Sequence, residues 1–222
     1  MEELRISSLW QEADKSIAYP YLAAFTYPWE ALSAIGNMIE EIAKSLSRDE
    51  FREIAPAVFV AKSARIAKTA CIDGPCIICE NAEVRHGAFI RGKAIVGRGA
   101  VVGNSAELKN CILFDGVQVP HFNYVGDSIL GYRAHLGAGA VTSNVKSDKS
   151  YVAVRCLGRC VETGCRKFGA MLGDYVEVGC NSVLNPGTVI GRYSNVYPLS
   201  SVRGYVPPES IFKSNFNIVK KR

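Results

Sequence analysis

Large apolar residues recur at every sixth position from Val60 to Phe114, usually two places after a small residue. A period of six fits neither an α-helix nor a heptad repeat, but it fits a short strand followed by a tight corner. Three such strands make one triangular turn of about 18 residues, and stacked turns pair with one another. The pattern predicts an all-β chain folded as a parallel β-helix. The apolar series is Val60, Ile66, Ile72, Ile78, Val84, Ile90, Val96, Val102, Leu108 and Phe114, and the small residues are Ala64, Ala70, Cys76, Ala82, Ala88, Ala94, Ala100 and Ala106.

The rhythm is interrupted twice. Between Pro120 and Leu130 its phase slips by four residues, and the stretch 143–171 is too long for a corner. We expect 143–171 to leave the stack as an excursion loop, a kind of segment that often binds ligands. The series then continues as Leu172, Val178, Leu184, Ile190, Val196 and Val202, with Ser182, Thr188, Ser194 and Ser200 in the small positions.

His121 lies inside the first interruption, directly after a proline in a position where the rhythm calls for an aliphatic residue. Segments that break an otherwise regular pattern are frequent functional sites, so 117–131 is predicted to be an active site. Near neutral pH an imidazole can act as a general base. The alternative is a histidine with a purely structural role.

The N-terminal part differs from the repeat. Residues 1–27 carry aromatics and prolines without a period, which indicates an irregular arm. From Pro28 to Leu46 the apolar residues fall on one helical face, with Thr26 as a possible cap, and this predicts a helix that closes the end of the main domain. The expected organisation is an arm with a packing helix over 1–54, a β-helix domain over 55–210 and a C-terminal tail over 211–222.

Composition narrows the possible functions. The net charge of +5 suits phosphate-bearing small molecules, but no run of five basic residues argues for nucleic acid. No apolar stretch is long enough to span a membrane, and the acidic start Met1–Arg5 lacks the layout of a signal peptide. We therefore expect a cytoplasmic protein whose eight cysteines stay reduced.

Two metal sites remain as alternatives. His86, His121 and His135 are the only histidines, and three histidines hold zinc in β-helical carbonic anhydrases; this would make the protein a zinc hydratase. Cysteines at 156, 160 and 165 could clasp the excursion round a metal, although their spacing is not a paired C-x-x-C. Those at 71, 76 and 79 fall in repeat positions. We favour the prediction that the protein has no metal site.

Several motifs between Ile90 and Asn144 are more specific than the repeat. They are Ile-Arg-Gly at 90–92, Glu-Leu-Lys at 107–109, His-Phe-Asn-Tyr-Val-Gly-Asp at 121–127 and Leu-Gly-Ala-Gly at 136–139. Their order resembles the acetyltransferase half of the bifunctional bacterial enzyme that makes UDP-N-acetylglucosamine, a hexapeptide-repeat acyltransferase. The sequence around His121, together with Arg166–Asp174, is similar to archaeal-type sugar-1-phosphate nucleotidylyltransferases with a hexapeptide C-terminal domain.

This resemblance implies a left-handed β-helix that forms homotrimers with sites in the clefts between subunits. It also implies that His121 removes a proton from the amine of an amino-sugar phosphate. Arg91 and Lys109 would hold the phosphate, Tyr124 would contact the phosphate or sugar, and Asn144 would orient the amine. Arginine offers a forked contact to phosphate and lysine a point charge.

The donor implied by the resemblance is acetyl-CoA. The backbone N–H near Ala138 would face the thioester oxygen, where negative charge develops. Cys180 and Pro198 would contact the pantetheine arm through their backbone, and Lys213 lies near a basic position that meets CoA phosphates.

The chain departs from the family on the sugar side. His135 stands where the acetyltransferases have asparagine, and Val145 stands where the bacterial enzyme has tyrosine. The expected loop lysine is out of register, with Lys146 and Lys149 nearby. We place His135 and Lys149 on the substrate side, and these departures leave open a different amine or a hydroxyl as acceptor.

The favoured prediction is an acetyl-CoA-dependent N-acetyltransferase for an amino-sugar phosphate such as glucosamine 1-phosphate. Residues 1–54 carry no Gly-rich phosphate loop, so we expect no pyrophosphorylase activity from this chain. The alternative is a non-catalytic trimeric scaffold or regulatory partner of a separate sugar nucleotidylyltransferase.

Overall fold

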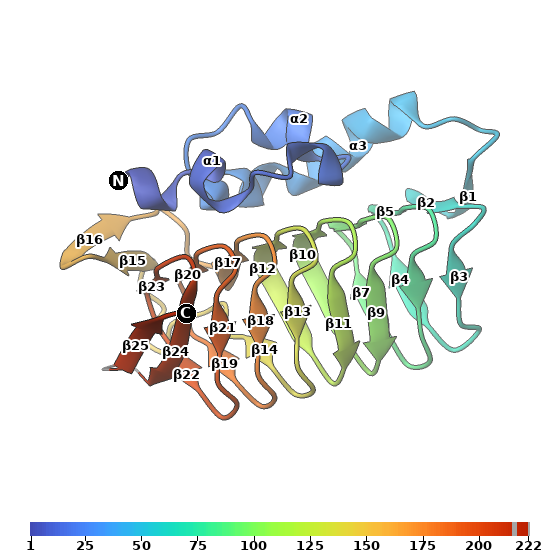
Figure 1. Cartoon of the computed structure of the whole chain (residues 1–222). Coiled ribbons are helices and arrows are strands. Elements are labelled where there is room, and N and C mark those ends of the chain that lie inside the picture. Colours follow the sequence, from blue (N-terminus) through green and yellow to red (C-terminus); the bar gives the residue numbers. More distant parts are fainter. Residues whose placement is uncertain (215–216, 222) are drawn as a thin grey trace.

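The computed structural model describes residues 1–214 and 217–221. Its main body is a stack of β-coils whose strands pair in parallel with the coils on either side (Figure 1). Each full coil has three strands separated by corners, so the stack is a prism with three faces and three edges. The predicted parallel β-helix is confirmed.

Face 1 is a nine-stranded sheet that is parallel except for its last strand. It consists of β3 (Arg65–Ile66), β6 (Glu83–Val84), β9 (Val101–Asn104), β11 (Gln118–His121), β13 (His135–Leu136), β18 (Glu177–Val178), β21 (Asn195–Val196), β24 (Ser210–Ser214) and the antiparallel β25 (Asn217–Lys220). The predicted C-terminal tail therefore contributes the last strand pair, while positions 215, 216 and 222 lie outside the described residues.

Faces 2 and 3 form one fourteen-stranded sheet, because β10 (Glu107–Leu113) and β12 (Tyr124–Leu130) continue round the edge between them. Face 2 also contains β4 (Cys71–Asp73), β7 (Phe89–Arg91), β14 (Val141–Thr142), β19 (Val183–Leu184) and β22 (Ser201–Val202). Face 3 also contains β1 (Phe51–Ala55), β2 (Val58–Ala61), β5 (Cys76–Ile78), β8 (Ala94–Val96), β17 (Ala170–Leu172), β20 (Thr188–Ile190) and β23 (Tyr205–Val206), with β1 antiparallel to β2.

We name the three edges after one residue on each. The chain passes from face 1 to face 2 round the His121 edge, and from face 2 to face 3 round the Asp127 edge. It returns from face 3 to face 1 round the Asp174 edge.

The strand register corrects the predicted phase slip. Pairing advances by 18 residues from Cys76 to Ala94, but by 17 from Ala94 to Cys111 and by 17 again from Cys111 to Ser128. The residue is lost each time at the Asp127 edge, where Asn110 and Asp127 turn the strand with φ of 50° and 48°. The single slip predicted between Pro120 and Leu130 is wrong, because it is the sum of two shortened corners.

The same register reassigns two positions near His121. Leu113, in register with Val96 and Leu130, is the inward residue of its coil in place of the predicted Phe114. The ring of Phe114 instead packs against Trp10, with ring centroids 5.2 Å apart. Val119 pairs with Val102 and fills the aliphatic position that had been assigned to the proline after it, so the rhythm is unbroken at His121.

Aliphatic residues in register form the core inside the prism. Leu113, Leu130 and Leu172 are all fully buried on neighbouring coils of face 3. Burying a leucine side chain stabilises a fold by about 1.5–3 kcal/mol. Hydroxyl residues in the later small positions are also buried but bonded: Ser128 Oγ donates to the Gly126 carbonyl at 2.7 Å and accepts from Ala170 N at 3.0 Å.

Short helices of the N-terminal arm run along face 3 (Figure 1, blue). They are η1 (Glu2–Leu4), α1 (Ile6–Leu9), η2 (Ala13–Lys15), α2 (Tyr19–Leu22), η3 (Pro28–Ala34) and α3 (Ile35–Ser45). α3 packs against β5, β8 and β10, and η3 packs against β12. The predicted helix over 28–46 is therefore split into a 3₁₀ and an α part, and it covers a face of the stack instead of closing its end.

The start of that helix also differs from the prediction. Tyr27 is the N-cap residue, and Thr26 does not cap through its side chain. The Glu30 carboxylate instead reaches back and accepts the backbone N–H groups of Thr26 and Tyr27, both at 2.9 Å. A carboxylate in the first turn is also favoured by the helix dipole.

The arm is fixed at the Asp174 edge. Trp10 is buried, and its Nε1–H donates to the Leu172 carbonyl at 2.8 Å. The buried Asp174 carboxylate accepts the backbone N–H groups of Gln11 at 2.8 Å, Glu12 at 3.2 Å and Tyr132 at 2.9 Å. Burial raises the pKa of Asp174, and these three donors oppose that shift.

The predicted excursion contains an antiparallel hairpin of β15 (Ala153–Cys156) and β16 (Arg159–Glu162). The chain rejoins the stack beside the Asp127 edge, where Phe168 N donates to the Asn144 carbonyl at 2.9 Å and Gly169 N to the Asp127 carbonyl at 2.8 Å. Across residues 1–214 and 217–221, no helix combines the length and the apolar character needed to cross a membrane.

Candidate active site

His121 ends β11, and its side chain is exposed on the His121 edge. Its backbone N–H donates to Asn123 Oδ1 at 3.0 Å, and its carbonyl accepts Gly139 N at 3.0 Å. Asn123 is itself buried and donates through Nδ2 to the carbonyls of Gly137 and Ala140, both at 2.9 Å. A buried amide thus ties two coils together and fixes the corner that presents the imidazole.

The predicted base and the predicted donor-binding residues stand in one row. His121 is three residues past Gln118, which pairs with His135, so His121 lies beside Ala138 on the next coil. The same pairing continues to Cys180, whose carbonyl accepts Leu199 N at 2.9 Å beside Pro198. Coils in a sheet are about 4.8 Å apart, so a ligand lying along this edge can reach several members of the row.

Lys213 lies close to the end of this row. It is on β24, opposite Tyr197, and its Nζ is 5.8 Å from the centroid of the Tyr197 ring. The predicted donor-binding residues Ala138, Cys180, Pro198 and Lys213 therefore gather along the His121 edge.

A second group of predicted residues lies at the Asp127 edge. The Asp127 carboxylate accepts Lys109 Nζ at 3.0 and 3.2 Å, Asn110 Nδ2 at 2.8 Å and Asn144 Nδ2 at 2.5 Å. Asn144 Nδ2 is also 3.4 Å from the Tyr124 hydroxyl. Partial burial, followed by the charge of Asp127, raises the pKa of Tyr124. The Asp127 carboxylate is thus the centre of a polar cluster that holds Lys109, Tyr124 and Asn144 together.

The remaining predicted substrate residues are more separate. Arg91 stands on the coil before Lys109 on face 2 and pairs with Glu107 at 2.7 Å. His135 lies on face 1, where its Nδ1 is 2.8 Å from Glu177 Oε2. Lys149 is exposed in the excursion and donates its backbone N–H to the Lys146 carbonyl.

The two groups are not in contact within one chain. Among the described residues, no hydrogen bond or ion pair joins the His121 side chain to the Asp127 cluster. Face 2 separates the two edges, and its strand starts at Tyr124, three residues after His121. The structure therefore brings together the predicted donor residues on one edge and three of the six predicted acceptor residues on the other.

Asp127 and Asn110 were not predicted as site residues. Both are nearly buried, and Asn110 also donates to the Leu32 carbonyl of the arm at 3.2 Å. The signal that could have found them is the shortened spacing of the inward series, Leu108 to Leu113 and Val125 to Leu130. Asn110 and Asp127 line a cavity of about 370 Å³ between the arm and residues 163–167 of the excursion.

The cysteines and histidines do not assemble a metal site in the part of the chain that the structure describes. His86 Nδ1 lies 2.7 Å from Thr69 Oγ1, and His135 faces Glu177. Cys76, Cys79 and Cys111 are buried in the stack, and burial raises their pKa values, that of Cys111 to about 12. These three thiols are consequently protonated at neutral pH and act as small apolar residues.

Comparison with known proteins finds one family model and several relatives that match most of this chain. The family model of the GMPPB C-terminal domain matches residues 72–193, more than half of the chain. The bifunctional sugar-1-phosphate nucleotidylyltransferase/acetyltransferase of Sulfurisphaera tokodaii is 30% identical over 174 residues, which cover 70% of this chain and 43% of the relative. The bifunctional protein GlmU of Methanococcus maripaludis (strain C5) is 33% identical over 200 residues, 88% of this chain and 48% of the relative.

The chain spans about half the length of these two curated relatives. A third relative matches over nearly its whole length. The uncharacterized acetyltransferase YaiX of Escherichia coli (strain K12) is 30% identical over 205 residues, which cover 83% of this chain and 86% of that protein.

Proposed function

Because this chain belongs to the hexapeptide-repeat acyltransferases, within the GMPPB C-terminal domain family, we propose that it is an acetyl-CoA-dependent N-acetyltransferase. The proposed acceptor is an amino-sugar phosphate of the glucosamine 1-phosphate kind, and the proposed general base is His121. The relatives named as acetyltransferases support the type of reaction.

One observation carries the proposal: His121 shares an edge row with Ala138, Cys180 and Pro198. The coenzyme is long and thin, and the edge offers it backbone groups at each successive coil. A thioester lying along the coils of this row comes beside the exposed imidazole of His121.

The chemistry follows from that placement. The amine nitrogen attacks the thioester carbonyl carbon, a C–N bond forms, and the C–S bond breaks with release of the CoA thiolate. His121 takes the proton that the amine loses and returns it to the thiolate. The backbone N–H near Ala138 stabilises the negative charge on the carbonyl oxygen during the attack.

The acceptor is assigned to face 2 and the Asp127 edge. Arg91 and Lys109 supply positive charge for its phosphate, and Tyr124 and Asn144 supply hydrogen bonds. We place the reaction in the cleft of a homotrimer, where the His121 edge of one protomer meets the next. Phe122 and Leu199 are 62% and 80% exposed on the His121 edge, where a neighbouring protomer would cover them.

One observation favours the second candidate, a non-catalytic scaffold that serves a separate nucleotidylyltransferase. Lys109 and Asn144 are already satisfied by Asp127 without any ligand. Side chains that already satisfy one another in this way suit a structural role.

The test is a thiol-release assay with acetyl-CoA and a panel of acceptors: glucosamine 1-phosphate, galactosamine 1-phosphate, and glucose 1-phosphate as the hydroxyl counterpart. We expect release with at least one amino sugar and less with glucose 1-phosphate. The scaffold would be supported if no thiol is released with this panel or with any further amino-sugar phosphate, and if a pull-down recovers a nucleotidylyltransferase.

A further inference from the structure

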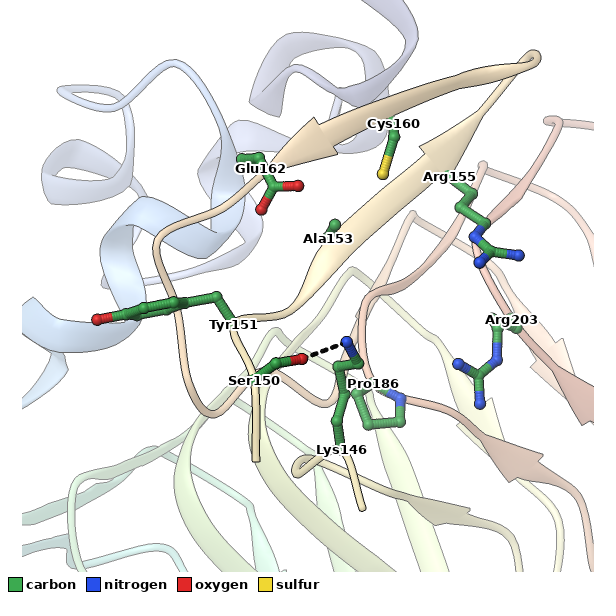
Figure 2. A pocket seen from close by; sticks show the side chains of 9 residues that line it. All are labelled: Lys146, Ser150, Tyr151, Ala153, Arg155, Cys160, Glu162, Pro186 and Arg203. Atoms are coloured by element: carbon green, nitrogen blue, oxygen red, sulfur yellow. Dashed lines mark hydrogen bonds between the residues drawn. The ribbon is translucent and has the colours of Figure 1, made fainter. Parts of the chain in front are cut away.

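A cavity of about 470 Å³ lies between the excursion hairpin and the last coils of the stack (Figure 2). Its lining includes Lys146, Ser150 and Arg155 from the excursion, Glu162 from β16, and Pro186 and Arg203 from the Asp127 edge. The cavity shares no residue with the His121 row or with the Asp127 cluster, so the proposed reaction gives it no role.

Two glycines set the position of the hairpin. Gly187 and Gly204 have φ of +81° and +80°, and a Cβ on them would lie 2.9 Å from the Ala153 carbonyl oxygen and 2.7 Å from the Arg155 carbonyl oxygen. The hairpin backbone can therefore rest directly against the edge. As a result Arg155 is held next to Arg203, the residue before Gly204 in the chain.

The lining carries an excess of positive charge. Lys146, Arg155 and Arg203 face one carboxylate, Glu162. Lys146 pairs with Asp148 at 3.4 Å and donates to Ser150 Oγ at 2.5 Å. Among the described residues, neither Arg155 nor Arg203 has a carboxylate within ion-pair distance, and Arg203 makes only a 3.5 Å contact with Asn185 Oδ1.

Figure 2 shows the guanidinium groups of Arg155 and Arg203 on the same side of the cavity, with Lys146 between them and Ser150. Holding like charges together without a counter-ion is unfavourable, and an anion between them relieves the repulsion. The planar fork of arginine matches phosphate oxygens, to which it donates two parallel hydrogen bonds.

We propose that this cavity is a second ligand site, which binds a phosphate monoester or diphosphate group. The group has three possible carriers with the same chemistry: the ribose 3′-phosphate and diphosphate of CoA, a sugar phosphate, or a free phosphate ion. The site itself does not depend on the proposed reaction, because binding is measurable without turnover.

The experiment is isothermal titration calorimetry of the full chain with inorganic pyrophosphate at low ionic strength. We expect the double variant Arg155→Gln/Arg203→Gln to bind at least about tenfold more weakly than the wild type. Arg159→Gln is the matched control, because it removes one charge from the same hairpin outside the cavity lining; it should bind like the wild type. Glu162→Gln should bind a few-fold more tightly, since it removes the opposing carboxylate.

Parallel titrations with CoA, dephospho-CoA and glucosamine 1-phosphate identify the carrier. If the double variant binds CoA more weakly but dephospho-CoA unchanged, the 3′-phosphate of CoA occupies the site. If it binds glucosamine 1-phosphate more weakly, the site takes the sugar phosphate. If only pyrophosphate binding is weakened, the site takes free phosphate. The proposal is overturned if the wild type binds none of these ligands, if the double variant binds all of them unchanged, or if Arg159→Gln weakens binding as much.

Discussion

The His121 edge and the Asp127 edge are built from the same repeat but differ in the spacing of their corners and in the exposure of their side chains. At the His121 edge every full coil turns with the regular spacing, and the corners expose His121, Phe122 and Leu199. At the Asp127 edge the corners at Asn110 and Asp127 are one residue short, and their side chains are bonded to one another beneath the arm and the excursion.

The difference shows how a regular solenoid can supply two kinds of surface. A regular corner leaves backbone groups and one side chain per coil free for a ligand or another protomer. A shortened corner pulls its side chains toward a common centre, here the Asp127 carboxylate. Removing an exposed side chain from the first edge should therefore change chemistry, and removing the buried carboxylate at the centre of the second should change stability.

The largest effect is expected for His121→Ala. Losing a general base lowers turnover by about two to four orders of magnitude, while the exposed side chain adds little to folding. The thiol-release rate and a urea unfolding curve check the two parts. Full activity in this variant would remove the proposed base, and a large loss of stability would show that this edge is not the open surface described.

The opposite pattern is expected for Asp127→Ala. Lys109, Asn110 and Asn144 lose their shared acceptor, and breaking a largely buried pair of this kind costs about 3 kcal/mol of unfolding free energy. Urea unfolding measures the loss. Asp127→Asn is the matched control, because it keeps the volume and one acceptor oxygen and should lose less. Equal midpoints for both variants and the wild type would contradict the central role of this carboxylate.

Asn123→Ala tests whether the His121 edge depends on its one buried amide. The Ala140 carbonyl and the His121 N–H would lose their bonds to this side chain, and the Gly137 carbonyl would keep only the Ala140 N–H, at a cost of about 1–3 kcal/mol in unfolding free energy. Turnover should fall as well, because the corner no longer fixes the imidazole. Asn104→Ala removes a single exposed hydrogen bond to the His86 carbonyl in the same row and serves as the control. If both variants lose the same unfolding free energy, Asn123 does not fix the corner that presents His121.

The smallest effect is a pH dependence at the Asp127 edge. The raised pKa of Tyr124 means that, above its ordinary value of 10.0, the folded chain keeps a phenol proton that the unfolded chain releases. The free energy of unfolding then falls as the pH rises through this window. Tyr124→Phe should remove that part of the fall, measured as the difference between unfolding curves at pH 9 and above pH 10.

Tyr197→Phe gives the matched comparison on the His121 edge, where the ring is 46% exposed. If Tyr197→Phe changes the alkaline dependence of stability as much as Tyr124→Phe does, burial at the Asp127 edge is not what raises the pKa of Tyr124.

Most of the fold could be predicted from the sequence because each strand contributes one large inward-facing residue to the repeat. Val84, Ile90 and Val96 alone define a complete turn, and the parallel stack follows from their repetition. The two shortened corners could not be located in the same way. Phe114 continued the count by chance, since its ring is covered by Trp10 from the arm, a contact across more than a hundred residues that no local period encodes.

The site was only partly predictable for the same reason. Ala138, Cys180 and Pro198 were assigned through resemblance, and the strand register then brought them into one row with His121. The break in rhythm predicted at Pro120 is absent, because Val119 keeps the phase. Asp127 was overlooked, since a carboxylate in a corner looks solvent-exposed until the arm and the excursion close over it.

The N-terminal arm has a further consequence for how the molecule unfolds. A solenoid held only by contacts between neighbouring coils can fray from either end, one coil at a time. Here α3 contacts β5, β8 and β10, Trp10 reaches Leu172, and Arg192 donates to the Ser8 carbonyl at 3.1 Å. The arm acts as a splint that couples distant coils, so the stack should melt in one concerted transition, and cutting the chain between arm and stack should turn that transition into a graded one.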